Sequence, residues 1–316
     1  MAFFDQPVRC HLPAMADSLH RNRPDTASRH TGSMATPAPG APHAGLISSA
    51  LEVAGRLAND AAEVITATAG RLAFPGAKTH PFDWVTETDR TLERHTRRVL
   101  AAEFPGCSVL GEEYGGAGAD GEALLLPGNP GGPELLWIVD PVDGTSNYVA
   151  GVPWCCYSLA LVDAQGPLVG VVADPYQGQI YAAARGLGAR ANGRPLPPST
   201  LDSLAGALVF AEPGKPGRRP ELAGLIDRVR AAHAGVRVVG SSALAITQVA
   251  LGRAAAAILP SAGYFVWDVA GALSLALEAG MTVSDLDGKQ DTLPLDGLIV
   301  ARPGVAEEVA ALVTPR

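Results

Sequence analysis

Lysine is scarce in this chain. Only three lysines occur among 316 residues, at positions 78, 215 and 289, and the net charge is −8. The arginines are scattered, so no basic stripe can be traced along the sequence. Proteins that bind nucleic acid carry a concentrated basic surface, because phosphate contacts dominate the affinity. The sequence therefore disfavours nucleic acid as a partner.

Cysteine is also rare, and long apolar runs are missing. The four cysteines show no disulfide or zinc-site spacing, and they are Cys10, Cys107, Cys155 and Cys156. Cys155 and Cys156 lie in an apolar run, which is typical of small core residues. No apolar run reaches about 18 residues, so no membrane span is expected. The start, Met1 to Pro7, lacks the apolar core of a secretion signal. We expect a protein of the reducing cytoplasm.

The composition divides the chain into a tail and two lobes. Residues 1–43 contain six prolines, mixed charges and little periodicity, which predicts a disordered tail. The remainder is ordinary globular sequence, 47% hydrophobic and 18% charged over the whole chain. Its length predicts two lobes. We expect an N-terminal α+β lobe over 44–198 and a C-terminal α/β lobe over 199–316.

Hydrophobic periodicity predicts alternating helices and strands. Helices are expected over residues 44–73, 89–104, 220–231, 242–252, 266–279 and 305–313. Strands are expected over residues 108–111, 135–140, 157–163, 168–173, 179–184, 207–211, 236–239, 256–259 and 297–301. Helices that alternate with strands indicate layered α/β packing.

The most informative segment runs from Trp137 to Asn147. An apolar strand ends there in Asp140 and Asp143, and Gly144 and Thr145 follow directly. Two carboxylates at a strand end can hold Mg²⁺ and leave positions for phosphate and water. A helix beginning near Thr145 would point its N–H groups at an anion in the same place. The alternative is that Asp-Pro-x-Asp-Gly forms only a turn.

Three other segments carry acids in a related setting. Lys78 precedes Asp89 at the start of a helix, Glu112 follows a short apolar strand, and Asp268 opens a late helix. These segments, taken in order with the Asp140 motif, resemble the inositol monophosphatase family over residues 45–316. The resemblance implies an α-β-α-β-α sandwich, a homodimer, and a Mg²⁺-dependent, lithium-sensitive phosphatase acting on a small phosphorylated metabolite. Mn²⁺ is an alternative cation.

The resemblance also implies roles for individual residues. The implied metal ligands are Glu112, Asp140, the carbonyl of Val142, Asp143 and Asp268. Asp89 with Thr145 resembles the pair that orients and deprotonates the attacking water, and Glu112 joins them as a catalytic residue. The implied phosphate and substrate contacts are Lys78, Gly144, Thr145, Ser146, Gly240, Ser241 and Ser242.

Several of these residues have a simpler interpretation. Asp89 is also a natural N-cap for the helix that follows it. Asp268 suits the positive end of a helix dipole without any metal. Glu113 is interpreted as a solvated neighbour of Glu112.

The sequence departs from the inositol-cleaving members at one position. They carry a glutamate seven residues before the aspartate of the Trp-Asp motif, where this chain has Ser261. A polyol site would lose a strong hydrogen-bond acceptor there. A Gly- and Pro-rich insertion, residues 115–133, is expected to form a surface loop near the mouth of the site. The alternatives are a histidinol-phosphate, nucleotide 3′-phosphate or fructose-bisphosphate phosphatase, or a non-catalytic binding protein with this fold.

Overall fold

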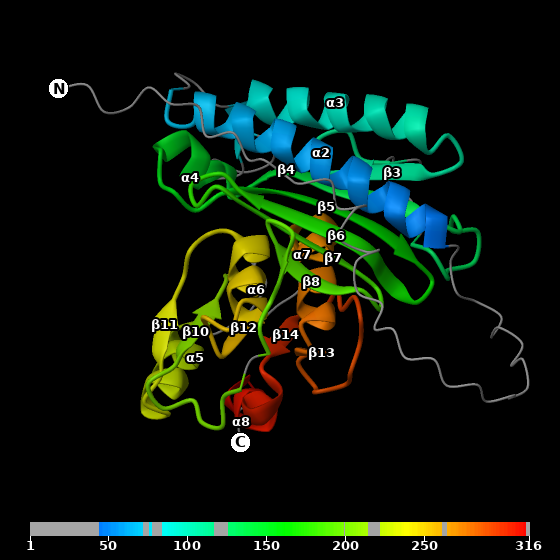
Figure 1. Cartoon of the computed structure of the whole chain (residues 1–316). Helices are drawn as coiled ribbons and strands as arrows, with labels where there is room; N and C mark the ends of the chain where they lie inside the picture. The colour runs from blue at the N-terminus through cyan, green and yellow to red at the C-terminus, as the bar shows by residue number, and fades with distance from the viewer. Residues whose placement is uncertain are drawn as a thin grey trace, which may run out of the picture.

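Helices and sheets alternate in five layers (Figure 1). The structure is a computed structural model, and it describes residues 44–71, 76–77, 84–116, 126–198, 200–213, 222–260 and 264–313. The predicted tail, Lys78 and Ser261 lie outside these ranges. The layers are two outer helices, a seven-stranded sheet, two inner helices, a five-stranded sheet and two further helices. The predicted α-β-α-β-α sandwich is thereby confirmed.

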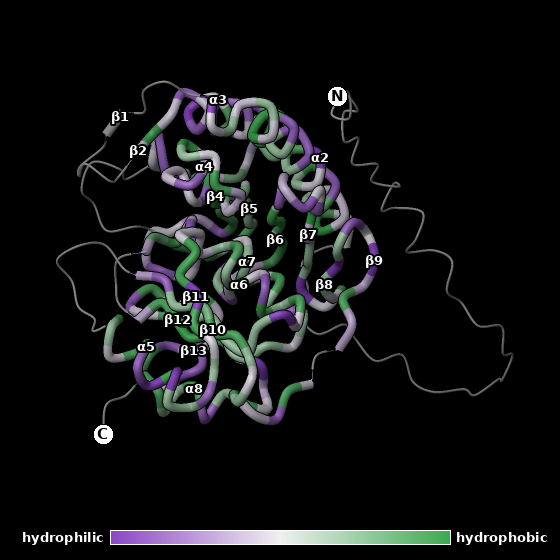
Figure 2. Tube along the Cα trace, turned by 90° about the vertical axis from the view of Figure 1, so that its left-hand side faces the viewer, coloured by the Kyte–Doolittle hydropathy of each residue, from purple (hydrophilic) through white to green (hydrophobic). Residues whose placement is uncertain are grey.

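The first helical layer covers one face of the larger sheet. It consists of α2 (Ala44–Thr68) and α3 (Glu87–Glu103). The buried face of α2 carries Ala54, Leu57, Ala61 and Ile65 at helical spacing, and these residues pack on the sheet. Figure 2 shows hydrophobic residues concentrated along the central strands, whereas hydrophilic residues are more frequent on these helices.

The seven-stranded sheet has its strands in sequence order. They are β3 (Ser108–Gly111), β4 (Leu136–Asp143), β5 (Cys156–Asp163), β6 (Gly166–Asp174), β7 (Gln179–Ala184), β8 (Gly188–Ala191) and β9 (Arg194–Pro195). Only β3 and β4 run parallel, and the other neighbours are antiparallel. Strands β4 and β6 are buried at every residue, because helices cover both faces of the sheet. This explains their continuous apolar runs.

The inner layer consists of α6 (Ser242–Ala250) and α7 (Val266–Glu278). Both helices are apolar on nearly all sides, since each packs against a sheet on either face. The five-stranded sheet follows in the order β11 (Gly235–Arg237), β10 (Leu208–Ala211), β12 (Ala256–Leu259), β14 (Leu298–Ala301) and β13 (Thr282–Ser284). The outer face of this sheet is covered by α5 (Leu222–Ala231) and α8 (Ala306–Val313), which follows the short 3₁₀ helix η1 (Pro303–Val305).

Three short elements complete the fold. Strands β1 (Gly76–Ala77) and β2 (Trp84–Val85) pair antiparallel, and α4 (Thr145–Ala150) follows β4. The expected helix start near Thr145 is confirmed. Strands β1, β2, β8, β9 and β13 were not predicted, and three of them, β1, β2 and β9, are only two residues long.

Several predicted boundaries were wrong: the helix expected over 44–73 ends at Thr68, and most of the predicted strands differ at one or both ends by one to three residues. Strand β4 continues past Asp140 to Asp143, because it stays paired with β5 as far as Asp143, whereas its pairing with β3 ends at Val139. Strand β11 ends at Arg237 rather than at Val239. The N–H of Val239 donates to the carboxylate of Glu212 instead of to a neighbouring strand.

The start of α3 also differs from one interpretation of the sequence. Thr86, not Asp89, is the N-cap, and Asp89 occupies the third helical position. Thr86 and Asp89 form a capping box, in which each residue satisfies a backbone N–H of the other.

In the described ranges, no helix combines the length and the apolar character needed to cross a membrane. Cys155 and Cys156 are completely buried, as predicted for core residues. The division of the chain into lobes at residue 198 stays a prediction.

Candidate active site

The end of strand β4 carries two buried carboxylates. Asp140 lies opposite Ser158 of β5 and Asp143 opposite Cys156, so β4 holds one extra residue between the two aspartates. A bulge of this kind redirects side chains at the end of a strand. Asp140 is 1% exposed and Asp143 is 7% exposed. Burial of two acids this close to each other requires compensation.

A cavity of about 160 Å³ opens at these aspartates. Its lining comes from distant parts of the chain and consists of Trp84, Glu112, Asp140, Val142, Asp143, Gly144, Thr145, Ser146, Gly240 and Asp268. The four predicted acidic ligands therefore share one cavity. Glu112 arrives from the turn after β3, and Asp268 arrives from the first turn of α7.

Hydrogen bonds hold each aspartate from one side. The N–H of Val142 donates to Asp140 Oδ1 over 3.0 Å. Asp143 Oδ2 accepts from the hydroxyl of Ser241 at 2.5 Å and from the N–H of Ala243 at 2.8 Å. These contacts fix the direction of both side chains.

Asp268 is held by its own helix. Its Oδ2 accepts the N–H of Phe265, the residue at the N-cap of α7, over 2.7 Å. This is the first-turn position that the dipole interpretation requires, and it also faces the cavity. The two interpretations of Asp268 are therefore compatible.

The acids shift the ionisation of one another. Burial raises the pKa of Asp140 well above its usual value, and the charges of Glu112, Asp143 and Asp268 raise it further. Burial likewise raises the pKa of Asp143 to about 6, although the Ser241 hydroxyl and the Ala243 N–H partly offset this rise. Mutual repulsion of this kind is what a bound cation would relieve.

The donor set fits a hard divalent cation. It consists of carboxylates with the backbone of Val142, and no histidine among the described residues lines the cavity. Oxygen ligands of this type suit Mg²⁺ or Mn²⁺. Among the described residues, no three His, Cys, Asp or Glu side chains already form a compact metal-binding group.

Asp89 and Thr145 meet at the side of the cavity. Asp89 is completely buried, and Thr145 Oγ1 lies 3.3 Å from Asp89 Oδ1 and 3.0 Å from the carbonyl of Val142. Asp89 Oδ2 accepts from the N–H of Thr86 at 2.9 Å and from the Thr86 hydroxyl. Asp89 therefore serves the capping box and Thr145 with different oxygens.

The turn into α4 requires glycine. Gly144 has a φ of +86°, and a Cβ there would lie 2.7 Å from the carbonyl oxygen of Trp154. Asn147, one turn later, donates to the carbonyls of Trp154 and Val239 over 2.8 and 2.7 Å. Through Asn147, α4 is tied to the segment that contains Gly240.

Of the predicted substrate contacts at residues 240–242, only Gly240 lies in the cavity lining. Gly240 lines the cavity, whereas Ser241 is 1% exposed and contacts Asp143 and the N–H of Leu244. Ser242, which is half-buried, is not part of the cavity lining. Substrate contact by these serines and by Lys78 stays a prediction.

Sequence reasoning missed Glu212, a buried acid beside the cavity. It is 4% exposed, and its two oxygens accept the N–H groups of Val239 and Gly240 over 3.0 and 2.9 Å. Burial raises the pKa of Glu212 to about 7. Like Asp140, it ends an apolar strand, and that signal could have identified it.

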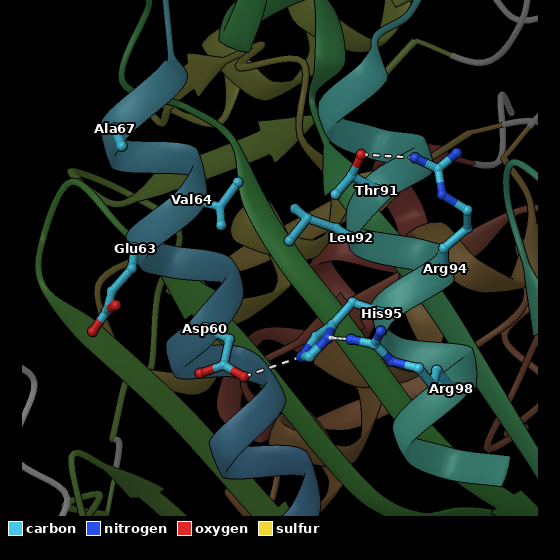
Figure 3. A pocket seen from close by; sticks show the side chains of 9 residues that line it. All are labelled: Asp60, Glu63, Val64, Ala67, Thr91, Leu92, Arg94, His95 and Arg98. Carbon is cyan, nitrogen blue, oxygen red and sulfur yellow. Dashed lines mark hydrogen bonds and ion pairs between the residues drawn. The ribbon is translucent and has the colours of Figure 1, made fainter.

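A larger hollow of about 760 Å³ lies elsewhere, between α2 and α3 (Figure 3). His95 bridges it by contacting Asp60 over 3.1 Å and Arg98 over 3.1 Å. Its charges are mixed and solvent-accessible, and it contains none of the clustered acids. The smaller cavity is the better candidate for chemistry.

Two comparisons of sequence identify the family. The model of the "Inositol monophosphatase family" matches residues 47–315. The chain belongs to the inositol monophosphatase family. It is 33% identical to inositol-1-monophosphatase ImpA of Mycolicibacterium smegmatis over 266 residues, which cover 80% of this chain and 90% of that protein. It is 34% identical to Nus factor SuhB of Pseudomonas aeruginosa over 258 residues, which cover 79% and 90%.

Solved structures of the family show the same fold. The Thermotoga maritima IMPase superposes with a TM-score of 0.73 at 27% identity, covering 84% of this chain and 96% of that one. The staphylococcal inositol monophosphatase-1 in a complex described as a 100 mM LiCl soaked inhibitory complex has a TM-score of 0.68 at 25% identity, covering 86% and 94%. This family is one of phosphatases.

Proposed function

We propose that this protein hydrolyses the phosphate monoester of a small metabolite with water, in a reaction that depends on Mg²⁺ or Mn²⁺. The observation that carries the proposal is the cavity shared by Glu112, Asp140, Asp143 and Asp268, which Thr145 and Ser146 also line. A site for phosphate hydrolysis must neutralise negative charge and position water, and both requirements match this lining.

The cation would be held by the four carboxylates and by the carbonyl of Val142. When bound, a divalent cation offsets the phosphate charge and lowers the pKa of water. The N–H of Val142 donates to Asp140 Oδ1, so one short segment of β4 fixes the positions of both a carboxylate and a carbonyl. Asp143 is fixed from the inner helical layer through Ser241, the N-cap of α6.

Thr145 and Asp89 would take the proton of the attacking water. The Thr145 hydroxyl has one proton and lies near two acceptors, Val142 O and Asp89 Oδ1. When the Thr145 hydroxyl donates this proton to Asp89 rather than to Val142 O, Thr145 Oγ1 can accept a hydrogen bond from water. As the water gives its proton to Thr145 Oγ1, the original Thr145 proton passes to Asp89 Oδ1.

The turn at Gly144 would hold the phosphate. Gly144, Thr145 and Ser146 line the cavity at the start of α4, where backbone N–H groups and hydroxyls are available as donors. Gly240 lines the cavity from the segment between β11 and α6; its N–H donates to Glu212, and Asn147 donates to the carbonyl of the preceding Val239. Gly240 is therefore a proposed substrate contact, whereas contact from Ser241 and Ser242 stays a prediction.

The substrate class we infer is a soluble sugar or cyclitol phosphate. The relative from M. smegmatis is named an inositol-1-monophosphatase, and this supports an inositol phosphate as the first candidate. Ser261, where inositol-cleaving members have glutamate, favours a different polyol or one of the alternatives named from the sequence. The dimer implied by the resemblance and the cytoplasmic location expected from the cysteine content remain predictions.

Phosphate release from a panel of monoesters tests the proposal. Wild-type protein should release phosphate only with added Mg²⁺ or Mn²⁺, and EDTA should stop the release. Asp140→Asn should lower the rate at least about 100-fold, because a ligand with full charge is lost. Glu52→Gln, which removes an exposed carboxylate from α2, should leave the rate unchanged. Full activity in EDTA would contradict the proposal, and inhibition by lithium would support it.

The second candidate is a binding role without catalysis. The observation in its favour is that the P. aeruginosa relative is named a Nus factor rather than a phosphatase. Absence of phosphate release across the panel, despite measurable Mn²⁺ binding, would favour it.

A further inference from the structure

A buried ion pair on α3 lies behind the Glu112 turn. The side chain of Glu93 is completely buried, and that of Arg97 is 27% exposed. Arg97 Nε donates to Glu93 Oε1 over 2.8 Å. Neither residue lines the cavity, so the proposed chemistry does not use them directly.

Glu93 contacts the backbone immediately after Glu112. Its Oε2 accepts the N–H of Glu113 at 2.7 Å, and its Oε1 accepts the N–H of Tyr114 at 3.2 Å. The carboxylate occupies the space beside Gly111 that a Cβ there would need. Glu93 therefore fills the concave side of the turn that carries Glu112.

Arg97 closes the same turn at both ends. Its Nη1 donates to the carbonyl of Val109 over 3.0 Å, and its Nη2 donates to the carbonyl of Gly115. The turn is also closed by the N–H of Gly111, which donates to Gly115 O over 2.9 Å. The planar guanidinium reaches two carbonyls and a carboxylate at once, which a lysine could not do.

We propose that Glu93 and Arg97 are positioning residues that hold the 111–115 turn so that Glu112 points at the cation. This inference rests on the proposed function. A buried ion pair contributes little net stability compared with apolar residues of the same volume, so the presence of this pair points to another role. The hydrogen bonds of Glu93 and Arg97 go to each other, to the turn, and to Val109 of β3 just before it, which identifies support of the turn as that role.

The position of Glu93 on α3 gives the arrangement a second consequence. Glu93 follows Asp89 by four residues, so both acids lie on the same face of one helix. Asp89 contacts Thr145, and Glu93 supports Glu112. A single rigid helix thereby sets the distance between the proton acceptor and a metal ligand.

Mn²⁺ binding by the full chain, measured by titration calorimetry without substrate, tests the inference. Outer contacts to metal ligands typically account for 10- to 100-fold in affinity. Glu93→Gln should weaken Mn²⁺ binding about tenfold or more, because the amide has one acceptor oxygen where the carboxylate uses two to accept the turn N–H groups. Arg97→Lys should lose less Mn²⁺ affinity, since lysine retains the positive charge but cannot reproduce the two guanidinium contacts to the carbonyls of Val109 and Gly115.

A matched control lies on the same helix. Glu103 pairs with Arg56 over 3.1 Å at the surface, and Glu103→Gln should leave Mn²⁺ affinity unchanged. Hydrogen exchange gives a readout that needs no cation, and Glu93→Gln should speed exchange at Glu113 and Tyr114. Unchanged Mn²⁺ affinity in folded Glu93→Gln, or in Arg97→Lys if the former does not fold, would overturn the inference. Wild-type protein that binds no cation would instead overturn the proposed function.

Discussion

At the scale of single residues, Glu212 has an unusual position for a carboxyl group. It is buried between the end of β10 and the Val239–Gly240 segment, and burial is the largest cause of its raised pKa. An acid whose pKa is higher in the folded state than in the unfolded state stabilises the fold at low pH. That contribution is lost as the pH rises through the folded-state value.

The pH dependence of unfolding should therefore change in Glu212→Gln. Between the usual pKa of 4.5 and the raised value of about 7, wild type should lose stability relative to the variant as the pH rises. The difference should change by up to about 3 kcal/mol across this window. Urea unfolding in EDTA at several pH values measures it. Parallel curves for the two proteins would contradict the prediction, and Glu52→Gln serves as the exposed control.

At the scale of elements, the inner helix α7 lies unusually close to the larger sheet. A Cβ at Gly271 would lie 2.5 Å from Ser158 Oγ and 3.0 Å from the carbonyl oxygen of Val171. Backbone atoms of β5 and β6 also limit this space, so movement of the Ser158 side chain alone would not make room for a methyl group. The same helix carries Asp268 into the cavity, so its distance from the sheet helps to set the site.

We expect Gly271→Ala to lower the free energy of unfolding by about 1–3 kcal/mol, because the added methyl overpacks a buried contact. Gly45→Ala in α2 is the matched control, since a Cβ there meets nothing within 4 Å. That control should be neutral or up to about 1 kcal/mol stabilising, because alanine is the better helix former. Urea denaturation measures both variants, and equal effects would contradict the packing argument.

At the scale of the whole molecule, the site combines acids that only the complete fold brings together. Glu112 and Asp140 belong to the larger sheet region, whereas Asp268 comes from the inner helical layer. Because burial and neighbouring charges raise the pKa of Asp140, its ionised form costs stability when no cation is present. This cost is present at neutral pH and disappears as the pH falls and the group is protonated.

Removal of metal should therefore destabilise wild type much more than Asp140→Asn. In EDTA at pH 7 we expect the variant to melt at a higher temperature, since asparagine can keep the Val142 N–H bond without the charge. With excess Mg²⁺ the wild type should gain several degrees, because a ligand at 100 times its Kd contributes about 2.7 kcal/mol. The variant should gain little. Equal gains from Mg²⁺ in both proteins would contradict a role for Asp140 in holding the cation.

Much of the fold could be predicted from local patterns. Strands β5 and β6 were recognisable because continuous apolar runs of that length fit a sheet covered on both faces. The two-residue strands β1, β2 and β9 could not be recognised, since two residues contain no period. The end of β11 was misplaced because Glu212, far away in the chain, takes the N–H of Val239.

By itself, the sequence determined the chemistry of the site: which acids are present, that they follow a strand or open a helix, and which family they resemble. Those properties depend on residue type and short spacing, which the chain displays directly. Only the tertiary structure decided that Glu93 and Arg97 support Glu112, and that Ser241 directs Asp143. Such contacts join segments from different layers, and no local pattern encodes which buried polar groups will meet.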